Sequence, residues 1–245
     1  MAHATQDVSD DGAIEPISRS LATFARGLSF ADLPAPVVGR AKLHILDGLG
    51  IALAASRYDY SHKTLSALRG LAGEGDFPVI GMAAKLPYRD SAVMNGFLIH
   101  SLDYDDTHVA GVLHATASAV PVILASGQRY GASGRDALVA YVAAMEADAR
   151  AGMAAKGGFH KKGFHPTGLV GSFGAAIAAG RMAGLTADQI THAQGIVYSM
   201  ASGNLEFLEE GAWTKRLHPG WAASSGITAG ALAQQGFAGP GTPYE

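Results

Sequence analysis

Apolar residues recur every three or four positions along most of the chain, a spacing typical of amphipathic α-helices. The helices that this spacing predicts lie at about 17–28, 38–49, 61–71, 90–100 and 115–128. In the first of them, one face is predicted to carry Ile17, Leu21, Phe24 and Leu28. One short apolar run, Phe77–Ile80, favours a single strand. The pattern therefore predicts a mainly helical protein.

Two further helices begin with residues whose side chains can cap a helix. Ser133 with Asp136, and Thr186 with Gln189, have the spacing of a capping box, in which each side chain bonds the other residue's backbone N–H. The helices behind these boxes are predicted at about 135–151 and 187–201.

Prolines mark the start of two more helices, since a proline in the first turn loses no hydrogen bond. On this ground Pro166 and Pro219 are placed in first turns, with helices running to about residues 181 and 235. The prediction is eight to ten helices in a compact all-α bundle, in which many of the 32 glycines let helix axes approach closely. Residues 15–245 would form this main domain, and the polar residues 1–14 would be disordered.

Composition and charge argue against several classes of protein. A net charge of −3 gives no basis for binding nucleic acid or an anionic membrane surface, so neither is expected as a partner. The longest apolar run, about Gly48–Ala55, is shorter than the roughly 20 residues of a membrane span. The polar N-terminus is unlike a secretory signal, and the cytoplasm is the expected location. The absence of cysteine excludes disulfides and a thiolate-held iron–sulfur cluster in this chain.

Three carboxylates, those of Asp103, Asp105 and Asp106, follow directly after the apolar segment 93–99. Buried carboxylates need partners or a use. If the preceding helix continued, Asp103 and Thr107 would share a face with Asp106 beside them, while Asp105 would point elsewhere. A solvated helix end is one alternative. The other is a Mg²⁺ site, which needs a second acidic cluster facing the first, and Glu206, Glu209 and Glu210 could serve as that cluster.

Two basic clusters stand immediately before predicted helix starts. His165 precedes a proline at the mouth of a helix, where backbone N–H groups favour anions, although a simple cap is the alternative. Lys215, Arg216 and His218 lie between two tryptophans, a combination suited to carboxylate recognition, with surface charge as the alternative. Together the clusters indicate a site that binds a small polycarboxylate and moves protons on it.

Three segments of the sequence resemble those of a known family. NGFLIHSLDYDDTH (Asn95–His108), GFHPTGLVGSFGAA (Gly163–Ala176) and WTKRLHPGWAASSG (Trp213–Gly226) resemble three signature regions of the MmgE/PrpD family, in the same order. The resemblance covers the chain from about Ile17 onward. It implies an all-α main domain that works without metal or organic cofactor, usually in a homodimer. It also implies an α/β lid domain and return helices, which have no counterpart here.

The resemblance implies a role for each residue that matches a family motif. The catalytic residues would be Asp103, Thr107, His114, His165 and Lys215. His108 is a rival to His114, and substrate binding would fall to Lys215, Arg216, His218 and His108. Lys215 would hold carboxylates, Thr107 would orient the substrate, and Asp103 or a histidine would take or orient a proton. His114 and His165 would shuttle protons, since imidazole titrates near neutral pH.

The activities that the family resemblance implies share proton chemistry next to a carboxylate. The expected function is a cofactor-independent lyase, most simply a dehydratase of the 2-methylcitrate type. Iminodisuccinate-like epimerisation and cis-aconitate decarboxylation are the alternatives within the family. The alternative of another class is a non-catalytic fragment or subunit that requires a separate lid-bearing chain.

Overall fold

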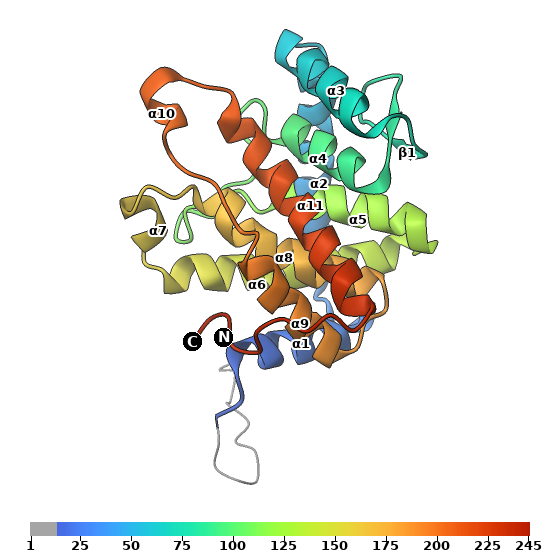
Figure 1. The fold of residues 1–245 in the computed structure, drawn as a ribbon. Helices are drawn as coiled ribbons and strands as arrows, with labels where there is room; N and C mark the ends of the chain where they lie inside the picture. Colours follow the sequence, from blue (N-terminus) through green and yellow to red (C-terminus); the bar gives the residue numbers. More distant parts are fainter. Residues whose placement is uncertain (1–13) are drawn as a thin grey trace.

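The computed structural model describes residues 14–245 as an assembly of α-helices with one minimal hairpin of strands (Figure 1). The all-α fold class predicted from the sequence is confirmed for these residues. The prediction of a disordered segment at 1–14 falls, except for its last residue, outside them.

The described elements follow one another along the chain with short connections, apart from the segment between α4 and α5. They are α1 (Ile17–Gly27), the 3-10 helix η1 (Phe30–Asp32), α2 (Ala35–Ala55), α3 (Asp59–Ala72), β1 (Phe77–Pro78), β2 (Lys85–Leu86), α4 (Tyr88–Ile99), α5 (Thr116–Tyr130), α6 (Gly134–Ala154), α7 (Gly158–Lys161), α8 (Pro166–Met182), α9 (Ala187–Tyr198), α10 (Phe207–Glu210) and α11 (Thr214–Gln234). The predicted count of helices is slightly low, because α7 and α10 have only four residues each and carry no periodic pattern.

Two central helices, α4 and α8, are buried on nearly all sides. Residues 91–99 of α4 are all buried, and α8 has buried residues along its whole length. α8 packs against α5, α6, α9 and α11, while α4 packs against α2, α3, α5 and α11. Because α11 contacts both central helices, it crosses one face of the bundle, as Figure 1 shows.

Glycines allow α11 to approach the two central helices closely. A Cβ atom on Gly220 would lie 2.1 Å from the carbonyl oxygen of Val93, and one on Gly96 would lie 2.6 Å from the Cα of Gly220. Further along α11, a Cβ on Gly226 would lie 2.4 Å from the backbone of Ala175 in α8. These contacts leave no space for a side chain. They bring the first turn of α11 next to the segment that follows α4.

The two predicted capping boxes are confirmed at the starts of α6 and α9. The Ser133 side chain accepts from the backbone N–H of Asp136, and the Asp136 carboxylate accepts from the N–H of Ser133. Thr186 and Gln189 make the same reciprocal pair. Pro166 also begins α8 as predicted.

Three details of the predicted elements are wrong. The buried face of α1 consists of Ser18, Ala22 and Ala25, while Ile17 and Phe24 are 52% and 40% exposed. Small side chains on that face let α1 pack closely on α9, so helix approach outweighs apolar area here. Pro219 lies inside α11, which begins at Thr214, so the first-turn placement fails.

The third wrong detail concerns the strand predicted over Phe77–Ile80, which has only two residues. They pair antiparallel with β2, in the register Phe77 with Leu86.

The next helix, α4, ends at Ile99, close to its predicted end. The acidic string therefore lies in irregular backbone, and Asp103 and Thr107 do not share a helical face.

Candidate active site

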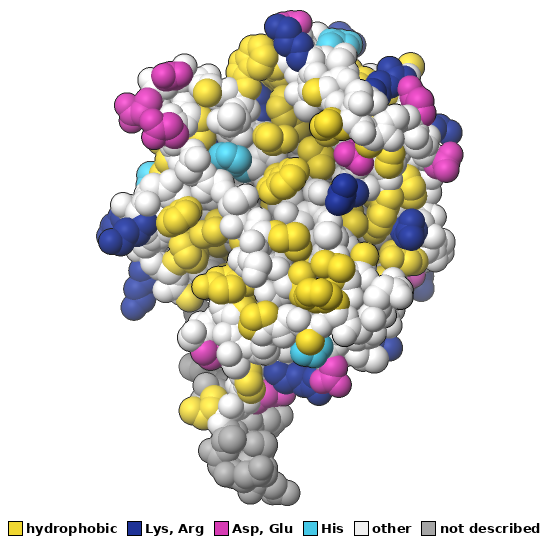
Figure 2. Space-filling model, viewed as in Figure 1, with side chains coloured by type: hydrophobic (Ala, Val, Ile, Leu, Met, Phe, Trp, Pro, Cys, Tyr) yellow, Lys and Arg dark blue, Asp and Glu magenta, His cyan; other side chains and the backbone are white. Residues whose placement is uncertain are grey.

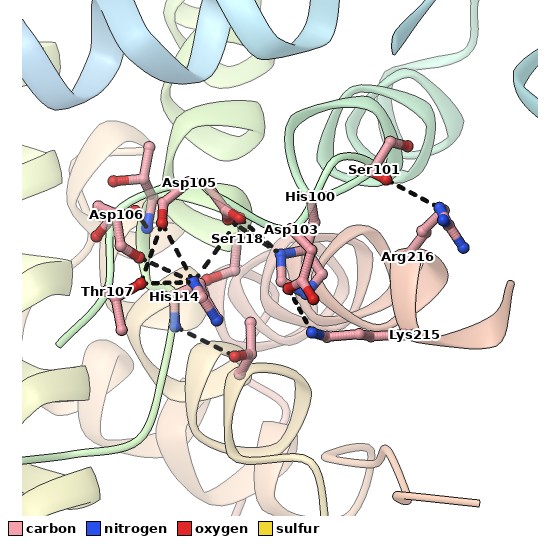
Figure 3. Close-up of polar contacts among 12 residues, drawn as sticks. His100, Ser101, Asp103, Asp105, Asp106, Thr107, His114, Ser118, Lys215 and Arg216 are labelled. Carbon is pink, nitrogen blue, oxygen red and sulfur yellow. Dashed lines mark hydrogen bonds and ion pairs between the residues drawn. The ribbon is translucent and has the colours of Figure 1, made fainter. Parts of the chain in front are cut away.

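The candidate site lies where the segment between α4 and α5 meets the first turns of α8 and α11 (Figure 3). Asp103 adopts a φ of 60°, a left-handed conformation that aspartate tolerates better than most residues. Its carboxylate forms an ion pair with Lys215 from the first turn of α11. Asp103 is about half exposed and Lys215 mostly buried, with side-chain exposures of 52% and 21%. One carboxylate and one ammonium group therefore stand at the edge of the site.

Four histidines form a row beside this ion pair. The ring centroids of His114 and His100 are 5.0 Å apart, those of His100 and His165 are 5.6 Å apart, and those of His165 and His218 are 5.1 Å apart. Phe207 packs edge-on against His165 and His218 at the far end of the row. The chain thus brings together imidazoles from four separate sequence positions.

Helix ends place two of the four histidines in the row. His100 is the C-cap of α4, and His165 is the N-cap of α8, in extended backbone before Pro166. The backbone N–H of His165 donates to the carbonyl of Gly203, and its Nδ1 lies 2.9 Å from Nδ1 of His218. Because two bare nitrogens would repel, one proton lies between these two rings.

His114 is held from several sides by groups that accept hydrogen bonds. Its Nδ1 lies 3.1 Å from the carbonyl oxygen of Asp106 and 3.3 Å from that of Asp105. Carbonyl oxygens only accept, so Nδ1 of His114 carries the proton and Nε2 is left to accept one. Thr107 also faces this nitrogen at 3.4 Å, and the backbone N–H of His114 donates to Thr167 in α8. Thr107 and His114 therefore lie side by side.

Burial sets the protonation of the row. Desolvation, followed by the neighbouring charges of the other histidines, lowers the pKa of His100 to about 3 and that of His165 to about 2. Desolvation likewise lowers the pKa of His218 to about 4. Without substrate these three rings are neutral near pH 7 and can accept a proton.

The carboxylates of the site titrate in opposite directions. Burial raises the pKa of Asp105 to about 7 and also raises that of Asp106. At Asp103 burial also disfavours the charged form, but the hydrogen bond and charge of Lys215 outweigh it and lower the pKa. Asp103 is therefore an ionised partner of Lys215, whereas Asp105 can hold or release a proton near neutral pH.

Two residues predicted to bind substrate lie away from this centre. Arg216 stacks over Tyr60 at 4.7 Å and donates from Nε to the carbonyl of Ser101, so it braces the end of α4. His108 accepts the backbone N–H of Gly111 through Nδ1 and closes a short turn. Of the two rival histidines, the structure thus places His114, and not His108, beside Thr107.

The three clustered carboxylates do not form a shared cation site within the described chain. In sequence order their partners are Lys215, the ring of His100, and the backbone N–H of Thr116. Three side chains with metal-ligand atoms do gather within 4.8 Å of one another, namely His100, Asp105 and His114. The Asp105 oxygens and the Nδ1 atoms of both histidines already face hydrogen-bond partners, and we interpret the group as an acid–base group.

Sequence reasoning missed two members of the site. His100 and Asp105 lie within the segment Asn95–His108, yet neither was given an acid–base role, and Asp105 was expected to point away from Asp103 and Thr107. Both are almost wholly buried, at 1% and 2% exposure. The available signal was the position of His100 at the end of an apolar helix, where a buried polar group needs a partner.

A hollow of about 840 Å³ opens beside the site, between α3 and α11. Its wall is largely aromatic and aliphatic and includes Tyr60, Leu71, Phe97, Leu217 and Trp221. Trp213 and Thr214, also in the wall, directly precede Lys215. Figure 2 shows hydrophobic side chains along the face that α11 crosses. Among the described residues, none of the helices combines the length and apolar character required to cross a membrane.

An all-α domain with a row of imidazoles beside a carboxylate–ammonium pair is suited to acid–base chemistry on a small anion. Comparison with known proteins agrees with this class. The profile described as the MmgE/PrpD N-terminal domain matches residues 19–245. The chain therefore belongs to the MmgE/PrpD family, as the resemblance implied.

Similar proteins include cis-aconitate decarboxylases. The chain is 30% identical over 239 residues to the cis-aconitate decarboxylase of Aspergillus terreus, and the match covers 95% of this chain and 49% of that protein. It is 32% identical over 233 residues to the cis-aconitate decarboxylase of Homo sapiens, covering 92% of this chain and 48% of that protein. A cis-aconitate decarboxylase-like protein, oryM, of Aspergillus oryzae is 31% identical over 231 residues, or 91% of this chain. The chain thus spans about half the length of the relatives it matches.

Proposed function

We propose that this chain supplies the acid–base half of a lyase that decarboxylates a cis-aconitate-like tricarboxylate without a cofactor. The observation that carries the proposal is the row of four histidines beside Lys215, of which His100 and His165 are buried. The names of the similar proteins favour decarboxylation over the 2-methylcitrate dehydration expected from sequence. Dehydration and epimerisation remain alternatives that the same groups could serve.

The proposed reaction needs one proton for each CO₂ released. The bond between carbon and the departing carboxylate breaks, and its electron pair forms a new carbon–carbon double bond. The electron pair of the original double bond takes a proton on the far carbon. An imidazole must deliver that proton, and Lys215 would hold one of the remaining carboxylates through a charge-assisted bond.

The negative charge of the bound substrate would favour protonation of one histidine in the row. The rings of His100, His165 and His218 are neutral without substrate because desolvation disfavours their charged form. A bound tricarboxylate places negative charges within a few ångströms and raises the pKa of the nearest ring. In our proposal His114 takes the proton at Nε2, because its Nδ1 already donates to backbone carbonyls. The site would therefore take up a proton together with its substrate.

We propose that a lid-bearing segment, equivalent to the part of the relatives beyond this chain, docks on the hollow between α3 and α11. Trp213 and Trp221 are 48% and 51% exposed there, and Leu71 is 84% exposed. Contiguous exposed apolar side chains of this kind mark interaction surfaces. The segment could belong to the same polypeptide or to a separate chain.

We also propose that the complete protein is a homodimer, as the family resemblance implies, and the outward face of α2 supports this. Leu43, Leu46 and Leu53 share that face and are 58%, 65% and 53% exposed. The space around Gly50 on the same face is open. Leu46→Glu should weaken self-association measured by light scattering, and an unchanged oligomeric state would contradict this contact.

Binding calorimetry tests the proposed function. Titration of cis-aconitate in two buffers of different ionisation enthalpy should show uptake of about one proton near pH 7.5. His114→Gln should abolish most of that uptake, while tricarballylate, which has the same charges without the double bond, should still bind. Binding with no proton uptake would contradict the proposal, as would turnover of 2-methylcitrate without turnover of cis-aconitate.

A further inference from the structure

The most deeply buried acid–base contact of the site joins two residues to which neither the sequence motifs nor the proposed mechanism gives a role. The side chains of Asp105 and His100 are both 0% exposed. The Asp105 carboxylate oxygens lie 3.0 and 3.1 Å from Nδ1 of His100. One of the same oxygens lies 3.7 Å from Nδ1 of His114. Asp105 therefore stands between two imidazoles and faces the same nitrogen of each.

We propose that Asp105 is a positioning residue, which keeps the proton on Nδ1 of both His100 and His114 so that both Nε2 atoms can accept a proton. The ionised carboxylate only accepts hydrogen bonds, so His100 must donate to it from Nδ1, and its charge 3.7 Å from Nδ1 of His114 favours a proton there too. The backbone carbonyls of Asp105 and Asp106 likewise require the proton of His114 to lie on Nδ1. Nε2 of His100 has no hydrogen-bond partner among the described residues, which is consistent with a bare nitrogen.

The role in catalysis rests on the function proposed above. When a tricarboxylate binds and His114 becomes protonated at Nε2, the Asp105 carboxylate stabilises the resulting imidazolium through the Nδ1 side. The ring centroid of His100 lies 5.0 Å from that of His114, which takes the proton in our proposal, and 5.6 Å from that of His165. A fixed tautomer at His100 therefore directs its bare Nε2 away from Asp105. The other charged groups near Asp105 are Asp103, Asp106 and Lys215.

An amide cannot replace the carboxylate in this arrangement. In Asp105→Asn the new side chain would offer one accepting oxygen, but its NH₂ group would present donors to the second imidazole. His114 keeps its backbone carbonyl acceptors, so His100, whose Nδ1 faces both side-chain positions, is the ring expected to move its proton from Nδ1 to Nε2. A neighbouring position supplies the matched control. In Asp106→Asn the side-chain oxygen can still accept the backbone N–H of Thr116, so both histidine tautomers should stay unchanged.

Nitrogen NMR of the histidine side chains tests the proposal on the full chain without any substrate. At pH 8, above the pKa of Asp105, ¹⁵N–¹H correlations should show His100 and His114 protonated on Nδ1, with assignments from His100→Gln and His114→Gln. Asp105→Asn should convert His100 to the Nε2–H tautomer, and Asp106→Asn should convert neither ring. A bare Nδ1 on either ring in the unaltered protein would overturn the proposal, whether or not the variants fold. Unchanged tautomers in Asp105→Asn would overturn it as well.

Kinetics separate this inference from the proposed function. In an active assembly, Asp105→Asn should lower kcat by at least about 10²-fold with KM within about 3-fold, since it leaves the carboxylate contacts of the substrate in place. A fall in kcat no larger than that of Asp106→Asn would count against the positioning role. Failure to turn over any polycarboxylate would overturn the proposed function, while the tautomer measurement would still decide the role of Asp105.

Discussion

Removing the ammonium group of Lys215 should separate catalysis from stability. Lys215→Met keeps the aliphatic stem and removes the charge that the Asp103 carboxylate and, in our proposal, a substrate carboxylate share. A hydrogen bond to a charged group contributes about 2–3 kcal/mol, and each 1.36 kcal/mol is a tenfold change. We therefore expect kcat/KM for cis-aconitate to fall by about 30- to 150-fold. Lys215→Arg, which keeps the charge, should lose less.

The same substitution should hardly change folding. The Asp103 carboxylate is about half exposed, so solvent screens the ion pair and its contribution to stability is at most about 1 kcal/mol. Urea unfolding followed by circular dichroism measures the contribution of the ion pair to stability, and steady-state kinetics measures the change in kcat/KM. Unchanged kcat/KM in a folded Lys215→Met variant would refute the assignment of Lys215 to the site. A loss of stability large enough to explain the lost activity would refute it equally.

Three further predictions follow from the packing and charges of the site. Gly220→Ala places a Cβ 2.1 Å from the Val93 carbonyl and should destabilise the fold by about 1–3 kcal/mol in urea unfolding, whereas Gly50→Ala, in open space, should be neutral or slightly stabilising. The lowered pKa values of His100 and His165 mean that their contribution to stability is fully present above about pH 6.5 and is lost as the pH falls, by up to about 1.4 kcal/mol per pH unit for each group. His165→Gln should flatten the dependence of unfolding free energy on pH between 6.5 and 4.5, and an unaltered slope would contradict that origin. Activity should survive exhaustive EDTA treatment, and a loss restored by Mg²⁺ would instead favour the metal alternative.

Local rules predict the helices of this chain well but not the segment that carries its chemistry. The helices α6 and α9, capped by Ser133 and Thr186, each have a capping box within four consecutive residues, so no distant contact is needed to place their first turns. The segment between α4 and α5 is shaped instead by contacts far along the chain. Lys215 pairs with Asp103, and Thr167 accepts the N–H of His114. Spacing along the sequence does not encode such contacts.

Burial is the other feature that sequence patterns misjudged. On α1 the alanine face packs inward and the larger apolar residues lie at its edge or in solvent, because close helix approach rewards small side chains. Asp105 was expected to point away from its neighbours, yet it is buried between two histidines. A charged residue is buried only where hydrogen-bond or charge partners surround it, and the tertiary fold supplies those partners.

Proton NMR of the reaction in D₂O tests the central proposal most directly. The complete assembly of this chain with its lid-bearing partner segment would be incubated with cis-aconitate, and the product and the remaining substrate analysed separately. We expect loss of CO₂ and a product that carries one deuterium on the carbon that received the proton, with no deuterium in the remaining substrate. Deuterium in recovered substrate without release of CO₂ would indicate an epimerase or isomerase. Addition of water without release of CO₂ would indicate a hydro-lyase, and either result would contradict the proposed decarboxylation.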